Sequence, residues 1–222
     1  MIPWETLGKE RAPDGGELIL YRRGGEFMIR VDGRELMSSR THGSEDVLAE
    51  LACAGLKDLE APRVLVGGLG LGFTLRAALD VLPSAARVVV AEIVPAVVEW
   101  NRGPVGPLAG RPLEDHRVAV VVKDVGAVLR RTKERFDAIL LDVDNGPAAL
   151  TRKGNHGLYV ETGLVATRAA LRPGGVLAVW SAAPDDVFVR RLERARFAVS
   201  THVVPARGIG GGPKHTVFLA RA

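Results

Sequence analysis

The stretch RVLVGGLGLGFTLR, residues 63–76, decides the fold. Its apolar residues 64–66 suit a buried parallel strand, and the glycines after them let the backbone turn sharply and approach a ligand. A helix beginning near Phe73 would direct its free N–H groups towards whatever binds above the glycines. The stretch predicts a strand, a turn and a helix, although such a turn can also be only a tight connection. The candidate binding residues are Gly68, Gly70 and Gly72.

The spacing of these glycines indicates the kind of ligand. They read GxGxG, and Phe73 stands where a further glycine would complete GxGxxG. The last glycine of that motif allows close packing of helix and strand in dinucleotide-binding folds. Its absence favours a nucleoside without a pyrophosphate, such as S-adenosylmethionine.

Composition sets limits on the class of protein. The chain has 222 residues, of which 47% are hydrophobic, so we expect one main core. The net charge is +4, but the basic residues are spread along the sequence, so we expect no nucleic-acid partner. Cys53 is the only cysteine, and its apolar neighbours indicate a packed, unreactive thiol. No secretory signal and no membrane-spanning stretch are visible, so we expect a cytoplasmic protein.

Downstream of residue 76, strand patterns alternate with helix patterns. This alternation, with continuous apolar strands, predicts a mostly parallel sheet with helices on both faces. The last two strands have no helix between them, so we expect them to pair antiparallel, as in a methyltransferase-type, Rossmann-like sheet. The expected strands are 87–91, 118–122, 136–141, 176–180, 197–204 and 216–220, and the expected helices are 73–82, 95–101, one through 128–129, 161–171 and 185–194.

The sequence before residue 63 predicts a smaller unit. Strand patterns at 17–21, 27–31 and 35–37, joined by glycine-bearing turns, indicate a β-hairpin region over residues 1–42. Its role could be a lid, a dimer contact or part of the catalytic site. A helix over 45–57 with Ser44 as its N-cap would follow, and the α/β domain would span 43–222.

Carboxylates follow three of the predicted strands, where ligands bind in open sheets of this kind. Glu92 lies twenty residues beyond Gly72 and could accept hydrogen bonds from both ribose hydroxyls. Asp124 could accept from an adenine amino group, with the N–H of Val125 meeting a ring nitrogen. Asp142 would face a sulfonium. Each carboxylate alone could be a helix cap, but their shared position favours a nucleoside site.

The successive motifs resemble those of the spermidine synthase family of aminopropyltransferases and, more loosely, class I methyltransferases. They are RVLVGGLGLGFTLR, AEIVPAVVEW, KDVGAVL, FDAILLDVDNGP and LRPGG, within a similarity that covers roughly residues 17–180. The resemblance implies that Glu92 binds ribose, that Asp124 binds adenine and that the segment from Asp142 lines the transfer site. It also implies a donor, S-adenosylmethionine or its decarboxylated form, and a small amine acceptor.

Two departures leave the reaction open. The family's glycine loop reads GGGDGG, and here Leu71 replaces the aspartate that would hold the donor's amino group. The family's DxxDP pattern reads DVDNGP over residues 142–147, so Asn145 replaces the aspartate that serves as base, and Asp144 could substitute for it. Methyl transfer and aminopropyl transfer are therefore both possible. A catalytically inactive, nucleoside-binding or dimerising homologue is the alternative.

The expected chemistry is displacement at a carbon bonded to a sulfonium, in which the protein aligns an unprotonated amine. Asp142 and Asp144 would attract and deprotonate the acceptor, with Asn145 and Tyr159 beside it. His215 and Trp180 could line the site or belong to ordinary packing. No histidine or cysteine cluster has the spacing of metal ligands, so we expect no metal. A homodimer is expected, whereas an NAD-dependent oxidoreductase is disfavoured by Phe73.

Overall fold

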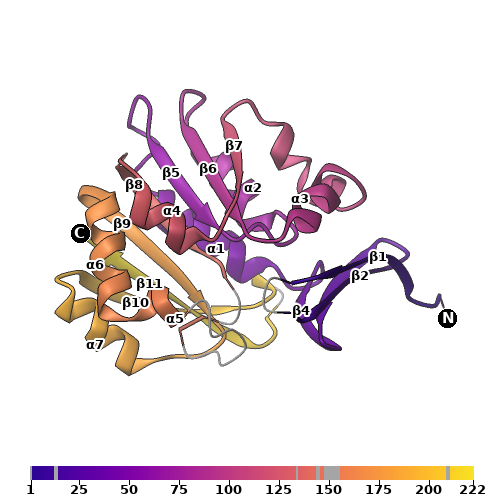
Figure 1. The fold of residues 1–222 in the computed structure, drawn as a ribbon. Helices are drawn as coiled ribbons and strands as arrows, with labels where there is room; N and C mark the ends of the chain where they lie inside the picture. Colours follow the sequence, from indigo (N-terminus) through magenta and orange to yellow (C-terminus); the bar gives the residue numbers. More distant parts are fainter. Residues whose placement is uncertain (1, 13–14, 134, 144–145, 148–155, 209–210) are drawn as a thin grey trace.

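The computed structural model describes residues 2–12, 15–133, 135–143, 146–147, 156–208 and 211–222. The described chain forms two sheets, one of four strands and one of seven (Figure 1). The strand order of the larger sheet is β10-β11-β9-β8-β5-β6-β7. These strands are β5 (Arg63–Gly67), β6 (Arg87–Glu92), β7 (Val118–Val122), β8 (Phe136–Leu141), β9 (Leu171–Ser181), β10 (Ala198–Pro205) and β11 (Lys214–Arg221).

The directions of these strands confirm the predicted fold class. β5 pairs parallel with both β6 and β8, and β9 continues the parallel series. β11 pairs antiparallel with both β9 and β10. The sheet is therefore of the methyltransferase type, with the antiparallel ending expected from the missing helix between the last two strands.

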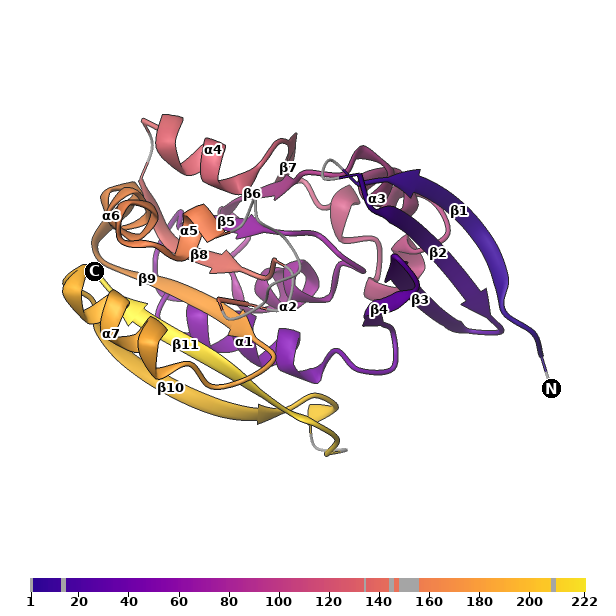
Figure 2. The same cartoon turned by 60° about the horizontal axis from the view of Figure 1, so that its bottom comes forward.

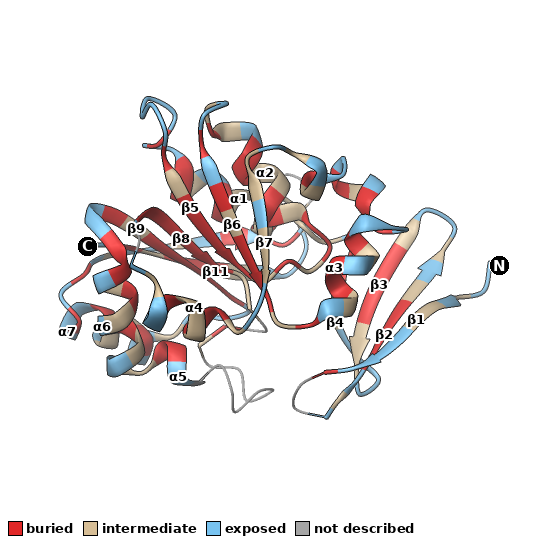
Figure 3. Ribbon diagram, turned by 45° about the horizontal axis from the view of Figure 1, so that its top comes forward, coloured by how far each residue is buried: buried red, intermediate tan, exposed pale blue. Residues whose placement is uncertain are grey.

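Helices cover both faces of the sheet (Figure 2). Alternating strand residues divide between two hydrophobic clusters: Val64 and Val66 pack with α1, α2 and α3, whereas Leu65 packs with α4 to α7. Figure 3 shows the central strands as almost continuously buried, as the apolar strand patterns predict. The helices are α1 (Gly43–Cys53), α2 (Phe73–Val81), α3 (Pro95–Arg102), α4 (Val125–Arg131), α5 (His156–Tyr159), α6 (Glu161–Ala170) and α7 (Asp186–Arg194).

The smaller sheet is an antiparallel meander of four strands, β1 (Glu5–Arg11), β2 (Glu17–Arg23), β3 (Glu26–Val31) and β4 (Arg34–Ser38). β1 was not predicted, because its residues are mostly polar and exposed and lack an apolar alternation. Gly8 of β1 lies against Trp100 of α3: a Cβ at Gly8 would lie 2.7 Å from the indole nitrogen. The small sheet therefore packs beside α3, and the arrowheads of β8 and β9 point towards β4 in Figure 2.

Three local predictions need correction. Ser44 is not the N-cap of α1: the cap position is His42, and Ser44 lies inside the helix with a buried side chain. That helix ends at Cys53 rather than near residue 57. β9 begins before the predicted strand 176–180 and is irregular over 173–175, where Leu171 pairs with Phe136 and Val176 with Ala138. Cys53 is fully buried, and burial raises the pKa of its thiol to about 12, which agrees with a packed, unreactive side chain.

Candidate active site

The glycine loop between β5 and α2 has the conformation that its sequence predicts. Gly68, Gly70 and Gly72 all have positive φ angles, of 90°, 53° and 88°. At Gly68 a side chain would collide with the backbone carbonyl of Asp142, and at Gly70 it would lie 2.9 Å from the sulfur of Met37. Glycine is needed at both positions because a Cβ would meet the neighbouring strand end or β4.

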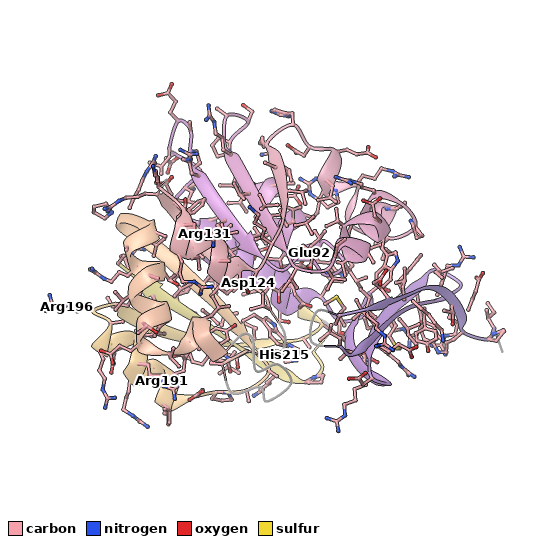
Figure 4. The ribbon with its side chains drawn as sticks, viewed as in Figure 1. Glu92, Asp124, Arg131, Arg191, Arg196 and His215 are labelled. Atoms are coloured by element: carbon pink, nitrogen blue, oxygen red, sulfur yellow. The ribbon has the colours of Figure 1, made fainter. Side chains whose placement is uncertain are left out.

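Glu92 stabilises this loop from the end of β6. Its carboxylate accepts hydrogen bonds from the backbone N–H of Leu69 at 3.0 Å and of Val94 at 2.8 Å. The side chain is 7% exposed. A carboxylate oxygen can accept more than one hydrogen bond, so these N–H donors do not exclude ribose hydroxyls. Figure 4 shows Glu92 and Asp124 near each other at the centre of the molecule.

Asp124 caps α4, as the alternative interpretation of this residue allowed. Its Oδ1 accepts a hydrogen bond of 2.7 Å from the N–H of Ala127. Asp124 and Val125 also line a small cavity together with Glu92 and Asp142. The structure therefore brings the three predicted carboxylates to one cavity, and a capping role does not remove Asp124 from it.

Asp142 follows β8 and lies against the first turn of α2. Its Oδ2 accepts a hydrogen bond of 2.5 Å from the hydroxyl of Thr74, and its backbone N–H donates to the carbonyl of Gly67. Burial raises the pKa of the Asp142 carboxyl, and the bond from Thr74 opposes that rise.

Two cavities flank Asp142. The larger has a volume of about 320 Å³, within the usual range for small-molecule sites of roughly 300–1,000 Å³. The smaller, which contains the three carboxylates, is about 80 Å³. Four residues line both cavities: Leu36, Met37, Gly70 and Asp142. An adenosyl group could occupy the smaller cavity only if this shared wall moved, and the flexible Met37 is the side chain best suited to do so.

The larger cavity contains a carboxyl group that the sequence analysis did not assign to the site. Glu45, in the first turn of α1, lines it together with Asp142, Thr74, Trp180 and His215. Burial and, to a smaller extent, the nearby Asp142 raise the pKa of Glu45 to about 8, although a hydrogen bond from Ser44 opposes the rise. The sequence did not indicate that Glu45 belongs to the site, because most of α1 and a loop separate it from the glycine loop.

One predicted residue, Tyr159, is not brought to these cavities. Tyr159 is buried among apolar side chains, with its ring edge-to-face on Phe188 at 5.6 Å between centroids, and it lines neither cavity. Asp144 and Asn145 lie outside the described residues. His42, which precedes α1, stacks on Phe73 with 4.0 Å between ring centroids and hydrogen-bonds Asp46. His215 and Trp180, by contrast, do line the larger cavity.

Among the described residues, no group of three or more His, Cys, Asp or Glu side chains could hold a metal ion. None of the helices in the described ranges is long and apolar enough to cross a membrane. The labelled arginines in Figure 4, Arg131, Arg191 and Arg196, lie away from Glu92 and His215.

Comparison with known proteins identifies the family. Residues 45–188 match the model of the spermine/spermidine synthase domain, which is more than half of the chain. The chain belongs to the spermine/spermidine synthase family. It is 33% identical over 125 residues to polyamine aminopropyltransferase 2 of Pseudomonas aeruginosa. That match covers 54% of this chain and 34% of the relative, so the chain spans about a third of the curated relative that it matches.

Solved structures of spermidine synthases have the same fold. The enzyme from Thermotoga maritima is 18% identical, with a TM-score of 0.77 over 97% of this chain and 72% of that one. A spermidine synthase in complex with the transition state analogue AdoDATO is similar over the same shares, with a TM-score of 0.76 and 18% identity. A probable spermidine synthase from Corynebacterium glutamicum gives a TM-score of 0.66 at 16% identity, over 98% and 79% of the two chains. At these identities the likeness concerns the fold.

Proposed function

We propose that this protein transfers an aminopropyl group from decarboxylated S-adenosylmethionine to a small amine. The observation that carries the proposal is the position of Asp142, which lines both the cavity with Glu92 and Asp124 and the larger cavity with Glu45. A nucleoside in the first and an amine in the second would meet beside this carboxylate. The name of the Pseudomonas aeruginosa relative and the family supply the class of reaction.

In this proposal Glu92 accepts hydrogen bonds from the ribose hydroxyls while it holds the glycine loop through Leu69 and Val94. Asp124 and the N–H of Val125 recognise adenine. Asp142 complements the positive charge of the sulfonium, because a carboxylate close to a cation in a partly buried site stabilises it. The leaving group is a neutral thioether, so alignment of the amine is the main task of the protein.

Methyl transfer is a second candidate, and Leu71 favours it. This side chain is 3% exposed and apolar, at the position where the family pattern has an aspartate for the donor's amino group. A site without that aspartate has less reason to prefer the decarboxylated donor. Four further predictions stay untested: an inactive nucleoside-binding homologue as the alternative, a dimeric state, a cytoplasmic location, and a domain boundary between residues 42 and 43.

Calorimetry with decarboxylated S-adenosylmethionine, S-adenosylmethionine and methylthioadenosine tests the proposal. We expect binding of the decarboxylated donor and of methylthioadenosine, followed by aminopropylated product from 1,3-diaminopropane or 1,4-diaminobutane, detected by mass spectrometry. Asp142→Ala should abolish the product. Binding of only the carboxylated donor would establish methyl transfer instead, and absence of binding to all three would refute the proposal.

A further inference from the structure

Three side chains from distant parts of the sequence meet beside Glu45. The Ser44 hydroxyl lies 2.6 Å from Oε2 of Glu45, 2.9 Å from Nδ1 of His215 and 3.0 Å from Nε1 of Trp180. Ser44 is on α1, Trp180 on β9 and His215 on β11. Trp180 and His215 also contact each other edge-to-face, with ring centroids 4.7 Å apart.

The chemistry of these groups fixes the direction of the hydrogen bonds. The indole N–H of Trp180 can only donate, so it donates to the Ser44 oxygen. The single hydroxyl proton of Ser44 is then available for the Glu45 carboxylate, and the neutral His215 donates from Nδ1 to Ser44. Burial lowers the pKa of His215, which favours this neutral form. The network therefore directs one hydrogen bond at Glu45 and holds that carboxylate in a fixed orientation.

The remaining acids of the larger cavity are less suited to accept a proton. Glu35 of β4 is exposed, and Asp142 lies between the two cavities, where the proposed function places it beside the sulfonium. The groups of the cavity that could influence Glu45 electrostatically are Asp142 after β8, His215 on β11 and Glu35 on β4, with Asp46 beside it on α1. The described lining residues of α2 and of the segments next to β10 and β11, Phe73, Thr74, Ala206 and Pro213, carry no charge.

We propose that Glu45 is the base that removes the proton from the amine acceptor, and that Ser44, with Trp180 and His215, is its positioning residue. The inference rests on the proposed function. It accounts for the reaction in a chain where Asn145 replaces the family's base, and it assigns the role to α1 rather than to the segment after β8. A base must lie within reach of the proton it removes, and Glu45 lines the cavity where the acceptor would bind.

The proposed step balances in atoms and charge. The acceptor enters as an ammonium and gives one proton to the Glu45 carboxylate. The lone pair of the resulting amine forms the new nitrogen–carbon bond, while the carbon–sulfur bond breaks and its electron pair neutralises the sulfonium. The product leaves as an ammonium with the positive charge, and Glu45 then releases its proton to solvent. The pKa of an alkylamine is about 10 to 10.5. The pKa of Glu45, near 8, is closer to this value than the pKa of an ordinary glutamate is.

The test compares Glu45→Gln with Glu50→Gln, which changes an exposed glutamate on the same helix. Turnover is measured from pH 6 to 10 with decarboxylated S-adenosylmethionine and 1,4-diaminobutane, and donor binding is measured by calorimetry. We expect kcat of Glu45→Gln to fall about 100-fold or more at neutral pH. Its residual rate should rise with pH as solution supplies neutral amine, while donor affinity stays within about threefold. Glu50→Gln should behave as wild type.

Further variants separate the possible failures. Glu45→Asp retains a carboxylate and should keep part of the rate, which serves as the test if Glu45→Gln does not fold. Unchanged turnover and pH profile in Glu45→Gln, or loss of turnover in Asp144→Asn alone, would overturn the inference and leave the proposed function standing. A wild-type protein that binds the donor but transfers nothing would refute the proposed function, and the inference with it. Failure to bind any donor would refute the proposed function itself.

Discussion

The side-chain amide of Asn101, on α3, donates a hydrogen bond of 2.8 Å to the backbone carbonyl of Gly70. The same amide also donates to the carbonyl of Val97 at 2.9 Å, and Asn101 is 2% exposed. The middle of the glycine loop is therefore attached to a helix that the sequence places about thirty residues later. The shape of the proposed nucleoside site depends on α3 as well as on the glycines.

We expect Asn101→Leu to weaken nucleoside binding by up to about tenfold, because the carbonyl of Gly70 loses its donor and the loop its attachment. Calorimetry with methylthioadenosine measures this effect. Thr167→Val is the matched control, since Thr167 is fully buried and donates to the carbonyl of Gly163 within α6. Both variants should lose stability, but only the first should lose affinity. Equal affinities would show that Asn101 does not shape the site.

We expect Gly68→Ala to be far more harmful than Gly174→Ala. Both glycines have positive φ angles, of 90° and 76°, so both alanines incur backbone strain of about 1–3 kcal/mol. Only at Gly68 would the added Cβ also collide with the carbonyl of Asp142, whereas nothing lies within 4 Å at Gly174. Urea unfolding measures the difference. Equal destabilisation would mean that β8 can move away from the loop.

We expect Glu92→Gln to remove the preference for ribose. In the wild type, adenosine should bind more tightly than 2′-deoxyadenosine, because Glu92 accepts from the sugar hydroxyls in the proposed complex. The variant should bind the two nucleosides within about threefold of each other. Glu99→Gln is the control, because Glu99 pairs with Arg102 on the exposed side of α3. A preference that survives in Glu92→Gln would assign ribose recognition to another group.

The protein should become less stable between pH 5 and 8. The pKa of Glu45 is raised from its ordinary value to about 8, so the folded state binds its proton more strongly than the unfolded state. The contribution to stability is present at low pH and is lost as pH rises towards 8, and the raised pKa of Asp142 has the same sign.

Chemical unfolding at pH 5, 6, 7 and 8 measures the slope of the free energy of unfolding against pH. Glu45→Gln should flatten the slope and should be more stable than the wild type at pH 8, whereas Glu50→Gln should leave it unchanged. A wild-type protein whose stability rises over this range, with no difference in Glu45→Gln, would contradict the pKa assigned to Glu45.

The sequence predicts the large sheet well because the controlling signals are local. Apolar runs such as 64–66 form strands, the glycines turn the chain, and the lack of a helix before the last strand gives the antiparallel ending. The family resemblance is confirmed by the match over residues 45–188. β1 was missed because a polar edge strand carries no periodic apolar signal.

The candidate site was less accessible to sequence reasoning. Glu92, Asp124 and Asp142 could be grouped because they follow consecutive parallel strands, and the structure brings them to one cavity. Ser44 looked like a helix cap, but its hydroxyl contacts Trp180 and His215, more than 130 residues away. Tyr159 was predicted to lie beside the acceptor, yet its ring packs in the core. Such contacts depend on how helices and strands pack, which no local pattern specifies.

The position of β11 also bears on how the chain folds during synthesis. This strand lies between β9 and β10, although it follows both in the sequence, and in the described sheet β10 is paired only with β11. β10 therefore has no place in the sheet until the ribosome has released Lys214–Arg221. His215 belongs to the same segment, so the cavity around Glu45 is completed only after β11 has been made. A nascent chain stalled before residue 214 would carry the glycine loop and all three carboxylates but would lack this wall.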